Sequence, residues 1–118
     1  MNDLQVFKNE QFGTVRTAMV NDEPWFVGKD VAICLGYKEP TKAAREKVDG
    51  EDRGMSKIDT PSGTQEMTII NEAGLYSLIL GSKLPTAKQF KHWVTSEVLP
   101  SIRKTGSYTV KDKPKKSI

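Results

Sequence analysis

Residues 71–108 read NEAGLYSLILGSKLPTAKQFKHWVTSEVLPSIRKTGSY, and they hold most of the helix-forming, aromatic and long aliphatic residues of the chain. Leu75, Leu78 and Ile79 stand at i, i+3 and i+4, the spacing of one apolar helix face. A second stripe at helical spacing consists of Ala87, Phe90, Val94 and Val98. Pro85 suits the first turn of this second helix, since its fixed φ is already helical. The stretch therefore predicts two helices and a helical extension, around which the rest of the chain should pack.

The whole chain has the length and composition of one domain. It has 118 residues, of which 36% are hydrophobic, and a chain of that size usually buries a single core. We expect the domain over residues 1–108 and a basic flexible tail, or the start of a linker, over residues 109–118. No apolar run approaches the ~20 residues that span a bilayer, and no signal peptide is evident, so we expect a cytoplasmic protein.

Cys34 and His92 are each the single residue of their kind, which excludes an internal disulfide and a Cys/His metal cluster. We therefore expect no metal and no cofactor. No nucleophile paired with a base is evident either, so an enzyme is not expected. His92 is interpreted as a surface residue and Cys34 as a small core residue.

The net charge of +3 is unevenly distributed along the chain. From Arg103 onward there are six basic residues and one acidic residue, whereas the first 102 residues carry 12 basic and 14 acidic residues. A nucleic-acid-binding surface on the folded part must therefore come from segregation of its charges. The tail KDKPKKSI is interpreted as a solvated segment, with a basic DNA-binding arm as the alternative.

Two β-hairpins are predicted ahead of the helical stretch. Residues 4–8 and 12–20 are rich in β-branched and aromatic residues, and a turn signal over residues 21–24 precedes the extended Trp25-Phe26-Val27. Residues 12–27 should thus form one hairpin. The second should join residues 53–59 to 65–71 through the turn TPSGT. Its Arg53 and Lys57 are candidate wing contacts to DNA, against the alternative of solubilising charges on a half-exposed strand. The acidic residues Asp49, Glu51 and Asp52 before it are interpreted as a solvated loop.

Residues 29–48, KDVAICLGYKEPTKAAREKV, have the form of a helix-turn-helix segment. Gly36 provides the tight turn and Pro40 can start the second helix, in which Ala44 should face inward. Lys38, Lys42 and Arg45 then form a basic stripe on the outer side. A helix with such a stripe can enter the ~12 Å major groove of DNA.

The same stripe is also compatible with an ordinary solvated helix face. Glu39 and Glu46 flank it, and Lys42 could pair with Glu46 one turn away. Both interpretations therefore remain open for this helix. A second basic face is expected on the later helix, where Lys88, Lys91, His92 and Thr95 lie opposite the apolar stripe.

Several blocks together resemble a known family. The succession WFVGKDVAICLGYKEPTKAAREKVDGED, followed by QEMTII and by residues 71–108, is similar to the Bro-N domain, the N-terminal domain of baculovirus BRO proteins and of many phage and prophage antirepressors. The resemblance covers roughly residues 6–108. Gly28 and Gly81 depart from it, since many relatives have a bulkier or charged residue there.

The resemblance implies a nucleic-acid-binding module of viral or prophage origin without enzyme activity. The elements predicted above make up a small α+β domain of two hairpins, a helix-turn-helix-like segment and a C-terminal helical pair. On these grounds we expect the DNA-binding module of a phage or prophage antirepressor-like regulator. The expected contacts to double-stranded DNA are Lys38, Lys42, Arg45, Lys57, Lys88, Lys91, Arg103 and Lys104. The alternative is a protein-interaction module that binds and inactivates a phage repressor. It requires an exposed apolar patch, for which Tyr37, Tyr76 and Trp93 are candidates.

Overall fold

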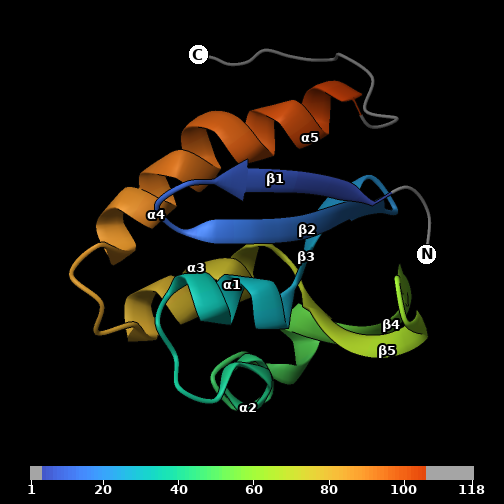
Figure 1. Ribbon diagram of the computed structural model, residues 1–118, viewed down its shortest axis with the longest axis horizontal. Helices are drawn as coiled ribbons and strands as arrows, with labels where there is room; N and C mark the ends of the chain where they lie inside the picture. The colour runs from blue at the N-terminus through green and yellow to red at the C-terminus, as the bar shows by residue number, and fades with distance from the viewer. Residues whose placement is uncertain (1–3, 106–118) are drawn as a thin grey trace.

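The computed structural model describes residues 4–105, with the side chains of residues 4–102. The predicted tail over residues 109–118 lies outside the described residues. The chain forms one five-stranded antiparallel sheet in the order β1-β2-β3-β5-β4. Helices pack against it, and the α+β class expected from the sequence is confirmed (Figure 1).

The N-terminal part of the sheet is a meander of β1 (Gln5–Asn9), β2 (Gly13–Val20) and β3 (Glu23–Val27). The turn between β2 and β3 is shorter than predicted. Only Asn21 and Asp22 form it, with φ of 53° and 65°, and such a pair of left-handed residues matches the twist of a hairpin. Pro24, expected in the turn, instead lies in β3 opposite Met19.

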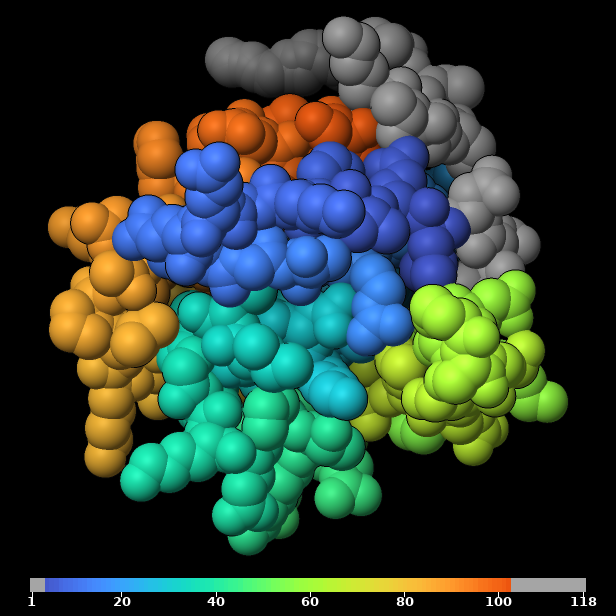
Figure 2. All heavy atoms as spheres, viewed as in Figure 1, coloured from blue at the N-terminus to red at the C-terminus, as the bar shows by residue number. Residues whose placement is uncertain are grey.

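The second hairpin consists of β4 (Arg53–Thr60) and β5 (Gly63–Ile70), as predicted. Only two residue pairs, Phe26 with Ile70 and Val27 with Ile69, join it to the meander. The hairpin therefore projects from the body of the molecule, at the right in Figures 1 and 2. The 3-10 turn η1 (Gly50–Asp52) leads into it.

The helix-turn-helix segment forms as predicted. It comprises α1 (Gly28–Cys34), a turn in which Gly36 has a φ of +81°, and α2 (Pro40–Glu46), with Pro40 as the first helical residue. That φ is left-handed, a conformation that only glycine adopts without strain. α1 packs on the sheet and α2 packs on α1 and β5.

The predicted helical stretch contains α3 (Glu72–Gly81), α4 (Ala87–Trp93), a π-helical turn η2 (Val94–Val98) and α5 (Leu99–Thr105). Both predicted apolar stripes face the core, where Phe90, Val94 and Leu78 are fully buried. Pro85 lies outside the helix, in the turn closed by the Ala87 N–H and the Leu84 carbonyl. The prediction that Pro85 lies in the first turn of this helix was therefore wrong.

The π-helical turn stands just ahead of Pro100. A proline lacks the N–H of a regular helix and its ring crowds the carbonyl four residues earlier, and a widened turn relieves both. The hydroxyls of Thr95 and Ser96 donate to the backbone oxygens of Lys91 and His92, at 2.9 and 2.6 Å. The helical run thus continues without a break from α4 to α5.

Candidate nucleic-acid interface

A partly buried ion pair joins α1 to the sheet. Asp30, in the first turn of α1, is only 7% exposed. Its Oδ2 accepts hydrogen bonds from the Nε and the backbone N–H of Arg16 at 2.8 and 3.0 Å, and its Oδ1 accepts one from the second guanidinium nitrogen at 2.8 Å. The hydrogen bond to Asp30 raises the pKa of Arg16. This pair sets the position of α1 on β2 and hence that of α2.

Small residues let α2 lie close against α1. Ala43 and Ala44 are buried, and a Cβ on Gly28 would stand 2.7 Å from the Cβ of Ala44. Only a glycine at position 28 allows this approach. Ala44 faces inward as predicted and Ala43 does so too, so the opposite face of α2 is turned to solvent.

That outer face carries the predicted basic stripe. Lys38, Lys42 and Arg45 are all exposed. Lys42 pairs with Glu39, not with Glu46 as considered from the sequence, and at 4.0 Å between two exposed side chains the pair is worth little. The basic side chains on this face of α2 therefore remain accessible to a ligand.

Charge is segregated around this helix. Residues 38–47 contain four basic and two acidic residues, a net +2. The following residues 49–66 contain two basic and five acidic residues, a net −3. The folded part is thus close to neutral in total but positive at α2.

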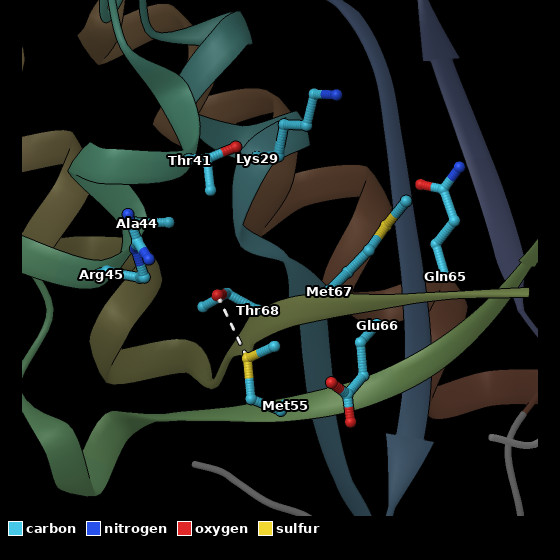
Figure 3. Close-up of a pocket in the computed structure, with 9 residues that line it drawn as sticks. All are labelled: Lys29, Thr41, Ala44, Arg45, Met55, Gln65, Glu66, Met67 and Thr68. Atoms are coloured by element: carbon cyan, nitrogen blue, oxygen red, sulfur yellow. Dashed lines mark hydrogen bonds between the residues drawn. The ribbon is translucent and has the colours of Figure 1, made fainter.

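A hollow of about 340 Å³ separates α2 from the β4–β5 hairpin. Figure 3 shows Lys29, Thr41 and Arg45 on the helical side and Met55 and Glu66 on the hairpin side. The sequence analysis did not single out Lys29 or Thr41, which line this hollow. Thr41 and Arg45 are four apart on one helix face, a spacing that could have been noticed, whereas Lys29 comes from another helix.

The hairpin side of this hollow is not basic. Lys57 is exposed on β4, but Glu66 stands directly opposite it on β5. Asp59 lies two residues further along β4 and so on the same face as Lys57. Opposite charges facing each other across a strand pair attract. The role of Lys57 as a wing contact stays a prediction.

The other predicted contacts lie on different elements. Lys88, Lys91 and His92 are exposed on α4, with the Lys91 Nζ 5.9 Å from the centre of the Tyr76 ring. Arg103 and Lys104 belong to α5 by their backbone, and their side chains lie outside the described residues. In Figure 1, α5 and α2 lie at opposite edges of the molecule. Lys38, Lys42 and Arg45 thus lie in or just before α2, away from α5, and the role of all these residues as DNA contacts stays a prediction.

Of the aromatic candidates for a protein contact, Trp93 is buried, while Tyr37 and Tyr76 are half-buried. Cys34 is buried, and burial, reinforced by the charge of Asp30, raises the pKa of its thiol to about 11. The thiol is therefore protonated near neutral pH and is a poor nucleophile.

Within residues 4–102, no group of three or more His, Cys, Asp or Glu side chains is arranged to hold a metal ion. The helices of the described part are all too short or too polar to cross a membrane.

Comparison with known proteins shows where the chain belongs. The family model of the N-terminal domain of the BRO family matches residues 14–100. An uncharacterised Haemophilus influenzae protein is 49% identical over 88 residues, which cover 73% of this chain and 43% of that protein. A Bro-N domain-containing protein of Invertebrate iridescent virus 6 is 40% identical over 114 residues, covering 81% of this chain and 27% of its own length.

A relative named Bro-N domain-containing protein ORF2, from Autographa californica nuclear polyhedrosis virus, is 30% identical over 70% of this chain. The chain spans less than half the length of these curated relatives. No solved structure matches it. The family model matches most of the chain, and the chain belongs to the BRO family as a Bro-N domain.

Proposed function

We propose that this Bro-N domain binds duplex DNA through α2, as the DNA-contacting module of a phage or prophage antirepressor-like regulator. The observation that carries the proposal is the exposed basic face of α2, a net +2 over residues 38–47, on a domain that is otherwise slightly acidic. Local charge of this kind attracts the phosphate backbone even when the total charge does not.

The dimensions of α2 suit the major groove. An α-helix with its side chains is about 10–12 Å across and the groove is ~12 Å wide, so this seven-residue helix can enter it. Lys42 and Arg45 are three residues apart and point to the same side, so both reach the duplex together. The hollow beside α2 adds Lys29 and the Thr41 hydroxyl as phosphate donors. Arginine and lysine can also contact the O6 and N7 acceptors of guanine.

The test is a fluorescence-anisotropy titration of a labelled mixed-sequence duplex at two salt concentrations. The double variant Lys42→Glu/Arg45→Glu should weaken binding by about tenfold or more and lower the salt slope by about 2, because each lost phosphate contact removes about one released counterion. Circular dichroism should show an unchanged fold, since both side chains are exposed.

A truncation after Tyr108 is the control for the basic tail. If affinity fell only in the truncated chain and stayed unchanged in the double variant, the tail would carry the binding and α2 would not. The alternative role, binding of a phage repressor, is favoured by a separate surface feature on the other side of α2.

A further inference from the structure

A second hollow, of about 430 Å³, opens between the α1–α2 turn and the loop that joins α3 to α4. Two hydrogen bonds hold its sides together: Ser82 Oγ donates to the Leu35 carbonyl and the Tyr37 hydroxyl donates to the Leu78 carbonyl, both at 2.8 Å. A Cβ on Gly81 would stand 2.8 Å from the Tyr37 hydroxyl, so the absence of a side chain at Gly81 leaves room for this hydroxyl. The hollow is therefore formed before any ligand arrives.

Its floor is apolar. Leu35, Tyr37, Leu84 and Pro85 line it, and Leu84 remains 37% exposed although it contacts Gly36. A volume of this size lies in the range of ligand-binding pockets and holds one or two large side chains. Covering Leu84 and Tyr37 with an apolar group would remove their exposed surface from water, which favours binding.

Its rim is basic. Lys38, Lys47 and Lys83 come from three different segments, and no acidic residue lines the hollow. Among the described residues, none of these three lysines lies within 4.0 Å of a carboxylate. Lys47 instead stands over the Tyr37 ring, with its Nζ 5.9 Å from the ring centre. The hollow thus combines an apolar floor with three positive charges that lack an acidic partner there.

We propose that this hollow docks a segment of a partner protein in which a large apolar side chain is flanked by Asp or Glu residues. The apolar side chain enters the floor and the carboxylates pair with the lysine rim. The chain's own residues 111–116 are a poor occupant, because they carry four lysines and one aspartate and would be repelled. Duplex DNA is a poor occupant too, because its phosphates gain nothing from an apolar floor. The site goes beyond DNA binding, with which it shares only Lys38.

The proposal can be tested by selecting a displayed library of random dodecapeptides against the whole chain. The enriched sequences should place Asp or Glu beside a large apolar residue, and a representative peptide should shift the NMR amide signals of Gly36, Gly81 and Leu84. Leu84→Arg should weaken that peptide at least about tenfold, because it fills the floor with a charge. The double variant Lys47→Glu/Lys83→Glu should weaken peptide binding to a similar extent. Because it leaves the apolar floor unchanged, this variant still tests the proposal if Leu84→Arg does not fold.

Lys42→Glu/Arg45→Glu is the matched control and should retain the peptide affinity, which separates this site from the DNA-binding face. The proposal is overturned if no sequence is enriched, if neutral or basic peptides are enriched, or if both rim and floor variants bind normally. It is equally overturned if Leu84→Arg abolishes self-association in sedimentation, which would make a second copy the occupant. A loss of DNA affinity in Lys47→Glu/Lys83→Glu as large as in the α2 variant would assign the rim to DNA instead.

Discussion

α2 and α4 are both seven-residue helices with cations on an outer face, yet they are anchored by different means. α4 inserts Phe90 and Trp93 into the core, where they meet Phe12 at ring-centre distances of 5.5 and 6.1 Å. α2 contributes only the buried alanines 43 and 44. The buried aromatic side chains fix α4 in the core, so α4 is a structural element with lysines on its surface. The small side chains of Ala43 and Ala44 let the backbone of α2 lie close to its neighbours, while the basic side chains of α2 extend into solvent.

This difference predicts that changes in the two helices separate stability from binding. Damage to the inner face of α4 should unfold the domain. Changes at the contact of α2 with α1 should cost less stability and should displace the basic face of α2. Changes in surface charge should affect DNA affinity only at α2.

The largest effect is expected for Phe90→Ala. Phe90 is fully buried and contacts two other rings, so truncation leaves a large cavity and removes aromatic contacts. The free energy of unfolding should fall by about 3–5 kcal/mol in a urea titration. Leu80→Ala is the matched control, because Leu80 is 86% exposed and its truncation should change stability by less than about 0.5 kcal/mol. If Phe90→Ala and Leu80→Ala were equally stable, burial of Phe90 would not be what holds α4 in the core.

Gly28→Ala should have an intermediate effect and should act on α2. The new methyl group would stand 2.7 Å from the Cβ of Ala44, so α2 must shift away from α1. Overpacking of this kind costs about 1–3 kcal/mol. DNA affinity of the folded variant should also fall, because the basic face moves with the helix.

Gly50→Ala provides the control for Gly28→Ala, since no atom lies within 4 Å of the added methyl group. It should leave unfolding and DNA affinity nearly unchanged. If both alanine variants were equally stable, the close contact between Gly28 and Ala44 would not constrain the position of α2.

The sequence predicted the elements of both helices because their signals are local. The apolar stripe through Phe90 and Val94, the turn at Gly36 and the helix start at Pro40 depend on residues within one or two turns of each other. Pro85 shows the limit of such signals. A proline suits both the first turn of a helix and the turn before it, and the sequence alone does not distinguish them.

The candidate site was predicted less completely than the fold. Lys38, Lys42 and Arg45 lie within about two helical turns of sequence, so helical periodicity was enough to predict them as a group. Lys29 joins the surface beside α2, and Lys47 and Lys83 line one hollow, only through packing between segments that lie far apart in the chain. The pairing of Asp30 with Arg16, 14 residues earlier, left no periodic signal either.

The smallest effect is expected for Lys88→Glu/Lys91→Glu on α4, and it tests the comparison most directly. The variant changes the net charge by the same amount as Lys42→Glu/Arg45→Glu, so long-range repulsion of DNA is matched and any difference in affinity reports contact. Beyond a Debye length of about 10 Å at 0.1 M salt, that repulsion is largely screened. DNA affinity should therefore fall by less than about threefold near physiological salt, with an unchanged salt slope. Loss of the contact between Lys91 and the Tyr76 ring should cost about 0.5–1 kcal/mol of stability. A fall in affinity as large as that of the α2 variant would make α4 part of the interface, and the two helices would then differ only in how they are anchored.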